Sequence, residues 1–346
     1  CGGYDSDILA GMQWAAGIAV AGVPTNSRPA RVLNLSLGGE GSCDSSVSMG
    51  ALYRSTINQV LAQNAVIVVA AGNSEGKAVG LPGNCPGVIT VAALRHVGTK
   101  VGFSDVGTEV AIAAPGGNCV NIGPGEACLY PMLSTMNTSL TTPVLGLAGA
   151  SYTDSYNAAV GTSFAAPLVA GTAALMLSAN PKLLPGEVLA ILKSSARPFP
   201  AMGGSTGISQ CHAPNSNAQD ECYCTTSTCG AGMLDAGKAV AGAVAFQAAA
   251  PTAFISVSPS NAQVGGNVVL SGLSSAAASG HSIVGYSWTL ITAGAGVNSL
   301  PSNTTNSSLA VSPTAVGSFT VRLTVLDDVG GSASQPGLVA LALSDQ

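Results

Sequence analysis

The feature that most constrains the fold is residues 65–71, a run without a polar side chain that reads AVIVVAA. A strand with one solvated face alternates apolar and polar residues, so an unbroken apolar run predicts a strand buried on both faces. Residues 31–37, 88–94 and 110–114 are further short, mostly apolar segments that we expect to be strands. Such strands occur in sheets that helices cover on both sides. The sequence therefore predicts an α/β fold around a mostly parallel sheet.

Segments with helical spacing are interleaved with these strands, as an α/β fold requires. Asp7 is a suitable N-cap for the first segment, and Pro181 lies just beyond the third. The expected helices span residues 8–18, 47–64, 162–179 and 185–195.

The pattern changes near Phe246, after which the helical spacing disappears. Apolar and polar residues then alternate in short runs separated by turn residues, which predicts an antiparallel β-sandwich. The runs cover residues 254–257, 268–271, 286–290 and 318–326. A chain of 346 residues is also too long for one ordinary core. We expect a larger domain over residues 1–245, a linker over 246–252 and the sandwich over 253–346.

Charge and hydropathy argue against two classes of partner. The net charge is −5 and only 8% of the residues are charged, so the chain offers no basic surface for nucleic acid or anionic lipid. The best candidate for a membrane span, Ala236–Ile255, is interrupted by Lys238, Gln247 and Pro251. A docking helix followed by a linker explains this stretch better.

Nine cysteines, most of them in loops rich in Gly, Asn and Ser, predict disulfides and a secreted, extracellular protein. Cys222 and Cys224 are too close in the chain to bridge each other comfortably. Each is therefore expected to pair with Cys211 or Cys229.

The remaining cysteines allow two further pairs. Cys119 and Cys128 could close a loop, and Cys1 and Cys43 are another pair. With these pairs, Cys85 has no disulfide partner among the nine cysteines, which suggests that its partner is missing.

A hydroxyl group lies at the start of the third expected helix, in the segment GTSFAAPLVAG of residues 161–171. The positive end of a helix and its free N–H groups favour the negative charge that develops beside an attacking Ser163. Pro167 has no N–H, so the carbonyl of Ser163 lacks its usual helical partner. Taken alone, this motif favours the simpler interpretation that Thr162 and Ser163 are helix-capping residues.

Two other motifs follow strands, at the edge where open parallel sheets build their sites. Asn73 ends the segment AAGN of residues 70–73, although an Asn after Gly often only forms a turn. The segment SLGG of residues 36–39 ends another strand, and its backbone could pair with an extended peptide.

In this order and spacing, the motifs resemble those of the subtilisin-like serine peptidases, over about Cys1 to Val244. The resemblance implies an endopeptidase that acts on proteins or peptides, with Ser163 as its nucleophile. Asn73 and the Ser163 N–H would stabilise the oxyanion. The implied substrate-binding residues are Ser36, Leu37, Gly38, Ala70, Ala71, Gly72 and Gly80. Gly80 would lie at the floor of the P1 pocket and leave room for large apolar side chains.

The Asp and His motifs of that family, D-[ST]-G and H-G-T-H-V-A-G, do not occur in this sequence. His96, His212 and His281 lie in other contexts, and Leu168 stands where the family often has His. The resemblance places both absent motifs upstream of Cys1. We therefore expect an N-terminal segment of the same protein to carry them, and a chain that starts inside a longer protein rather than a lipoprotein acylated at Cys1.

The C-terminal part resembles the polycystic-kidney-disease (PKD) type of immunoglobulin-like domain. The resemblance rests on Tyr286-x-Trp288 and on the segment GSFTVRLTVLD of residues 317–327, while Thr289 stands where that family usually has Asp. Such a domain could bind substrate protein, a cell surface or another copy of itself, or act as a spacer.

The main alternative to an enzyme is a catalytically inert binding protein or adhesin with a subtilase fold. The presence of both Ser163 and Asn73 argues against it. The expected chemistry requires no cofactor. Structural Ca²⁺ is common in the family, but the oxygen ligands here are scattered and none is assigned.

Overall fold

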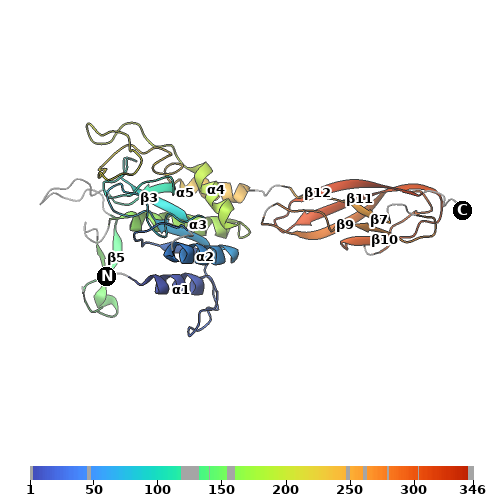
Figure 1. Cartoon of the computed structure of the whole chain (residues 1–346), viewed down its shortest axis with the longest axis horizontal. Helices are drawn as coiled ribbons and strands as arrows, with labels where there is room; N and C mark the ends of the chain where they lie inside the picture. Colours follow the sequence, from blue (N-terminus) through green and yellow to red (C-terminus); the bar gives the residue numbers. More distant parts are fainter. Residues whose placement is uncertain are drawn as a thin grey trace. The chain divides into compact units, whose positions relative to one another are not determined.

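The structure is a computed structural model that describes residues 3–44, 48–117, 132–139, 141–153, 160–246, 250–259, 263–278, 280–302 and 304–341. The chain divides into two compact units, residues 1–245 and 246–346 (Figure 1). Each unit has its own core and is described by itself.

The larger unit is built on a parallel sheet of four strands, and this confirms the predicted fold class. Its strands are β1 (Val32–Leu35), β2 (Val66–Ala70), β3 (Ile89–Leu94) and β4 (Val110–Pro115), which lie side by side in that order. Every residue of β2 and β3 is buried, as the apolar runs predict. Among the described residues, β1 pairs with β2 alone.

Helices cover both faces of this sheet. On one face, α1 (Asp5–Ala15) and α2 (Ser48–Ala62) share a core with β1 and β2, in which Met12 and Ile57 contact the cluster that contains Leu33 and Ile67. On the other face, α3 (Thr162–Ala179) contacts all four strands. The helix α5 (Ala236–Ala245) packs against α3, and α4 (Pro185–Ser195) packs against α5 and the strands β2 and β4 (Figure 1).

The first helix begins earlier than expected. Tyr4 is its N-cap residue, with extended backbone angles, and its carbonyl accepts the N–H groups of Asp7 and Ile8. Asp7 therefore lies in the first turn together with Asp5 and does not cap the helix. A carboxylate is favourable anywhere in the first turn, because the N-terminus of a helix carries partial positive charge. Both Asp5 and Asp7 can therefore lie inside the helix, and neither needs to cap it.

Among the described residues, α3 is the one helix that is long and apolar enough to span a membrane by length and composition. Half of it is buried inside the unit, and Ala165, Val169 and Ala173 have no exposed surface. These contacts with the sheet make α3 a core helix.

Three disulfides lie in the described residues, and one corrects the expected pairing. Cys43 bonds to Cys85 and not to Cys1, with their Cα atoms 5.0 Å apart. The cause is that the segment after β1 lies against the loop between β2 and β3: Gly39 N–H donates to the carbonyl of Leu81, and Asn84 Nδ2 donates to the carbonyl of Gly41. Residues 1, 119 and 128 lie outside the described part of the chain.

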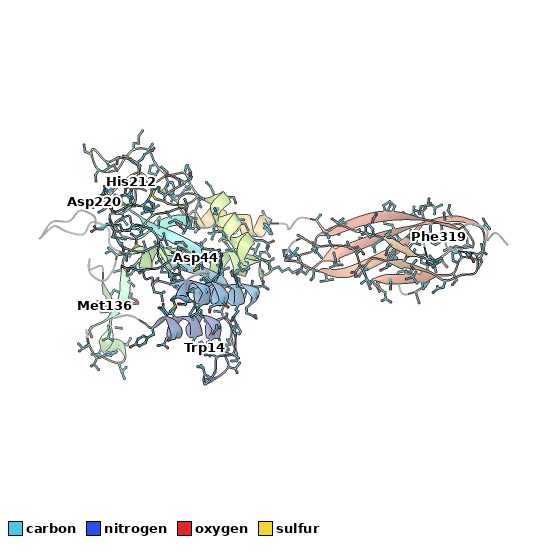
Figure 2. All side chains as sticks on the ribbon, in the orientation of Figure 1. Trp14, Asp44, Met136, His212, Asp220 and Phe319 are labelled. Atoms are coloured by element: carbon cyan, nitrogen blue, oxygen red, sulfur yellow. A yellow bond between two sulfur atoms is a disulfide. The ribbon has the colours of Figure 1, made fainter. Side chains whose placement is uncertain are left out.

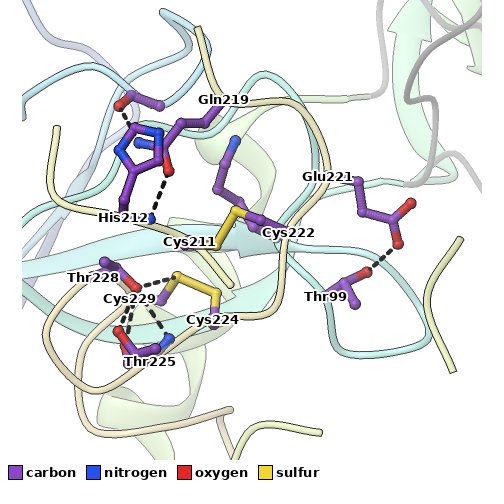
Figure 3. The surroundings of a disulfide bond; sticks show 12 residues. Thr99, Cys211, His212, Gln219, Glu221, Cys222, Cys224, Thr225, Thr228 and Cys229 are labelled. Atoms are coloured by element: carbon purple, nitrogen blue, oxygen red, sulfur yellow. Dashed lines mark hydrogen bonds between the residues drawn. A yellow bond between two sulfur atoms is a disulfide. The ribbon is translucent and has the colours of Figure 1, made fainter. Parts of the chain in front are cut away.

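The other two disulfides confirm the expected arrangement of the C-terminal cysteine cluster. Cys211 bonds to Cys222, and Cys224 bonds to Cys229 (Figure 3). Both disulfides belong to one buried cluster, so the segment of residues 209–229 is fastened to the unit beside β3 and β4.

A short hairpin between β4 and α3 was not expected from the sequence. It consists of β5 (Ser134–Asn137) and β6 (Ala150–Thr153), joined through the 3₁₀ turn η1 (Leu147–Gly149). Ser, Thr and Asn dominate these two strands, so no apolar alternation marks them.

The smaller unit is an antiparallel sandwich, as predicted. One sheet contains β7 (Ser256–Ser258), β8 (Val268–Ser271) and β10 (Ser308–Val311); the other contains β9 (Ile283–Thr292), β11 (Gly317–Asp327) and β12 (Ser332–Leu341). Trp288 and Phe319 belong to the buried core of this unit, and Figure 2 labels Phe319. The strands β10 and β12 were not expected. In β12, Pro336 and Gly337 interrupt the alternation of apolar and polar residues that would have indicated a strand. A proline is tolerated there because β12 lies at the edge of its sheet.

Candidate active site

Three segments that are far apart in the sequence meet at one end of the parallel sheet. They are the residues after β1, the residues after β2 and the first turn of α3. Parallel strands place their C-terminal ends at the same edge, and the N-terminus of α3 lies beside that edge. The arrangement brings Ser36, Asn73 and Ser163 together, as the sequence predicted for a site.

Ser163 is held at the start of α3 by a contact with the segment after β1. The Ser36 hydroxyl donates to the carbonyl oxygen of Ser163 at 2.7 Å. This carbonyl lacks its usual helical donor because Pro167 lies four residues further on within α3. Ser36 therefore satisfies the group that the proline leaves without a partner. The Ser163 hydroxyl itself makes a long contact of 3.4 Å with the carbonyl oxygen of Ser36.

The side-chain amide of Asn73 is oriented by Thr162. Asn73 Oδ1 accepts the backbone N–H and the hydroxyl of Thr162, both at 2.9 Å. A backbone N–H can only donate, so the amide oxygen must face Thr162 and the NH₂ group must face away from it. Among the described residues, Asn73 Nδ2 has no hydrogen-bond partner, and it remains free to bind a ligand.

The two N–H donors proposed for an oxyanion border the same space. A Cβ atom on Gly161 would lie 3.3 Å from Asn73 Nδ2 and 3.6 Å from the backbone nitrogen of Ser163. Ser163 is in the first turn of α3, where a backbone N–H has no partner within the helix. The glycine therefore leaves an opening that is lined by a side-chain donor and a main-chain donor.

The helix-capping interpretation of Thr162 and Ser163 is wrong. The N-cap residue of α3 is Gly161, with a φ of 142°, and no side chain caps the helix. Thr162 is instead buried and bonds to Gly72 and Asn73. Sequence reasoning gave Thr162 no role in the site, because its partners lie about ninety residues earlier in the chain.

A cleft of about 270 Å³ opens in front of these groups. Ser163 and Asn73 line it together with most of the predicted substrate-binding residues, namely Leu37, Gly38, Ala70, Ala71, Gly72 and Gly80. Ser36 lines an adjoining cavity of about 560 Å³ between α1, α2 and the segment after β1. Two acidic residues that the sequence did not suggest, Glu40 and Asp105, also line the smaller cleft.

The structure gives position 80 a reason to be glycine that the sequence did not suggest, in addition to its place in the lining of the cleft. A Cβ atom at this position would lie 2.0 Å from the carbonyl oxygen of Gly39. Glycine is therefore required because the segments after β1 and β2 approach closely here, and Gly39 N–H donates to the carbonyl of Leu81 at 2.8 Å.

None of the three histidines is among the residues that line the cleft. His96 lines a separate cavity with Arg197 and Met233. His212 lies in the disulfide-linked segment, where its N–H donates to Gln219 (Figures 2 and 3). His281 lies in the smaller unit, where its ring contacts Asp328. Among the described residues, Ser163 Oγ thus has only the carbonyl of Ser36 as a hydrogen-bond partner.

One group of potential metal ligands occurs among the described residues, at Cys211, Cys224 and Cys229. All three sulfurs are in disulfides, so they cannot act as thiolate ligands.

Comparison with known proteins identifies both parts of the chain. The model of the Subtilase family matches residues 1–223, and the model of a PKD domain family matches residues 260–339. An extracellular protease of Xanthomonas campestris pv. campestris is 38% identical over 246 residues, which is 70% of this chain and 34% of that protein. An extracellular basic protease of Dichelobacter nodosus is also 38% identical, over 58% of this chain and 29% of that protein.

A solved structure agrees with the match to the Subtilase family. A protease from Pseudoalteromonas arctica PAMC 21717 superposes with a TM-score of 0.54 at 39% identity, and the match covers 70% of this chain and 60% of that one. The chain spans about a third of the length of the two curated relatives.

Proposed function

Because the chain belongs to the subtilase family, we propose that it acts as a secreted serine endopeptidase with Ser163 as its nucleophile. One observation carries the proposal: Asn73 Nδ2 and the Ser163 N–H border one space beside the Ser163 hydroxyl, and Thr162 fixes the direction of the amide. Two preorganised N–H donors aimed at one point are what a developing oxyanion requires.

The proposed reaction is acyl transfer to Ser163 followed by hydrolysis. Ser163 Oγ attacks the carbonyl carbon of a peptide bond, and the carbonyl oxygen becomes an oxyanion that accepts from Asn73 Nδ2 and the Ser163 N–H. The proton of Oγ passes to a base and then to the leaving amine, and water releases the acyl group. A base is essential, because a neutral serine hydroxyl is a weak nucleophile.

We propose that an N-terminal segment of the same protein supplies the base, a His, and its orienting Asp. Two features of the described residues support this. The outer edge of β1 has no strand beside it, and α3 exposes Leu168 by 37% and Leu175 by 59%. A further strand and helix would cover this edge and this apolar surface.

N-terminal sequencing of the active protein, with intact mass under reducing and non-reducing conditions, tests this part. We expect a segment with D-[ST]-G and H-G-T-H motifs, continuous with Cys1 or retained as a nicked fragment. A soluble, folded and active protein with Cys1 as its only N-terminus would refute the proposed triad.

The substrates are proposed to be polypeptides bound in extended form along the segment after β1. Leu37 and Gly38 line the cleft together with residues 70–72, and Ser36 lines the adjoining cavity. In the proposed complex the substrate backbone would pair with residues 36–38, and residues 70–72 would form a wall of the pocket for the P1 side chain. Secretion is supported by the disulfides and by the two similar proteases, whose names describe them as extracellular.

Covalent labelling of the complete protein with a sulfonyl fluoride tests the nucleophile. We expect one adduct on the peptide that contains Ser163 and none in the Ser163→Ala variant. Ser194→Ala, at an exposed position on α4, is the matched control and should label normally. Labelling that survives Ser163→Ala would refute the assignment. A complete protein that neither labels nor cleaves peptides would favour the inert binding protein.

A further inference from the structure

The loop that carries Asn73 has a backbone conformation that needs support. Residues 72–77 lead away from β2, and Glu75 and Gly76 have φ angles of 63° and 81°. The left-handed region is unfavourable for a residue with a side chain, by roughly 1–2 kcal/mol, and persists only where surrounding contacts impose it. Asn73 and Glu75 are also exposed, so little packing of their own side chains fixes them.

The side chain of Asp105 binds this loop on both sides of the left-handed residues. Its Oδ1 accepts the backbone N–H groups of Ser74 and Lys77, each at 3.0 Å. Its own backbone N–H donates to the carbonyl of Gly72, also at 3.0 Å. One residue therefore makes three of the hydrogen bonds that hold the loop.

The approach of Asp105 depends on a glycine next to Asn73. A Cβ atom on Gly72 would lie 2.3 Å from Asp105 Oδ2, so no larger residue fits there without displacing the carboxylate. Gly72 also has a φ of 117°, which residues with a side chain rarely adopt. The carboxylate thus lies directly against the backbone that leads into Asn73.

Asp105 is buried, with 3% of its surface exposed. Burial raises the pKa of its carboxyl group, while the N–H groups of Ser74 and Lys77 and the cation of Lys100 act in the opposite direction. Lys100 is itself fully buried and donates to the carbonyl oxygens of Val101 and Gly102, two residues that lead into the turn before Asp105. Lys100 thus holds the segment that precedes Asp105, while the loop holds the Asp105 carboxylate.

We propose that Asp105 is a positioning residue for the oxyanion site. Its carboxylate fixes residues 72–77 and thereby the direction in which Asn73 presents Nδ2. The inference rests on the proposed function, because it assigns Asp105 an effect on the reaction only through Asn73. Thr162 fixes which way the amide faces, and Asp105 fixes the backbone that bears it.

A double-mutant cycle in the complete, active protein tests this role. Asp105→Ala should lower kcat by roughly 10- to 100-fold with KM nearly unchanged, which is less than the roughly 10²–10³-fold loss expected for removing the Asn73 donor itself. In the Asn73→Ala background, the same Asp105→Ala change should alter kcat by no more than about twofold. Residues that act through one another show this non-additivity, whereas a general loss of stability would affect both backgrounds equally.

Two further variants keep the test decisive if Asp105→Ala folds poorly. Asp105→Asn keeps an oxygen that can accept both N–H groups, so it should retain kcat within about twofold. Asp220→Ala is the matched control, since Asp220 is an exposed acid that also acts on Lys100, while the described hydrogen bonds of residues 72–77 include none to its carboxylate. It should leave kcat unchanged.

Equal losses in both Asn73 backgrounds, or a loss in Asp220→Ala as large as that in Asp105→Ala, would overturn the inference. A complete protein without Ser163-dependent activity would instead refute the proposed function, so the two failures are distinguishable.

Discussion

Replacing Lys100 with Met should change how the stability of the larger unit depends on pH. The side chain of Lys100 is fully buried, and its ammonium group donates to the carbonyl oxygens of Val101 and Gly102 at 3.0 and 2.8 Å. Burial lowers its pKa from the usual 10.5 to about 8, although Asp105 and Asp220 partly oppose the shift. The unfolded chain therefore binds a proton between pH 8 and 10.5 that the folded chain has released.

This difference sets the sign and the size of the effect. Stability rises with pH wherever the unfolded state binds more protons, so the lysine should contribute increasing stability as the pH rises from 8 to 10.5. At about 1.4 kcal/mol per pKa unit, the full shift corresponds to about 3 kcal/mol in the free energy of unfolding. For a unit of this size, that free energy corresponds to roughly 6–12 °C in Tm.

The assay is thermal unfolding of the complete protein at a series of pH values from 7 to 11. The Tm of the wild type should rise relative to that of Lys100→Met across the window, and the difference should be constant below pH 8. Lys182→Met, at an exposed position, is the control and should follow the wild type. Parallel curves for the wild type and Lys100→Met would show that Lys100 keeps its proton in the folded state, and would refute the reasoning.

Three further predictions concern the site and the disulfides. Asn73→Ala should lower kcat in the complete protein by roughly 10²–10³-fold with little change in KM, and an unchanged kcat would exclude Asn73 from the oxyanion site. Profiling with a peptide library should show a preference for large apolar or aromatic P1 residues, because residues 76–83 contain no acidic residue and the Asp105 carboxylate in the cleft is already bound by Ser74 and Lys77. A strict preference for Lys or Arg would show that the pocket is misplaced, or that Glu40 in the cleft selects the P1 residue. Non-reducing peptide mapping should recover peptides linked through Cys43–Cys85, Cys211–Cys222 and Cys224–Cys229. Free thiols at these six cysteines would contradict the structure.

The sequence predicted best the elements whose apolar residues can only be accommodated in the interior of the protein. The run at residues 65–71 contains β2 because seven apolar residues in a row cannot face solvent on either side. The helix α3 has the predicted bounds, since Gly161 precedes it and Pro181 follows its last turn. In contrast, β5 and β6 carry mostly polar residues, and only their pairing with each other defines them.

Long-range contacts explain why the site was only partly predictable. Sequence motifs brought Ser163 and Asn73 to attention, but the orientation of the Asn73 amide depends on Thr162, and the support of its loop depends on Asp105. Asp105 follows Ser104 in a segment whose function no local pattern reveals. The Cys43–Cys85 disulfide was missed for the same reason, because it depends on the approach of residues 39–41 to residues 81–84.

These contacts indicate how the site is assembled. Each polar group at its centre is held by a residue from a different segment: the Ser163 carbonyl by Ser36, the Asn73 amide by Thr162, and the loop around Glu75 by Asp105. A single hydrogen bond of this kind contributes only about 1 kcal/mol, so no one segment can fix the geometry alone. The two N–H donors come together only once the sheet has brought the strand ends and α3 together, so the proposed oxyanion site would be a property of the folded unit and not of any motif within it.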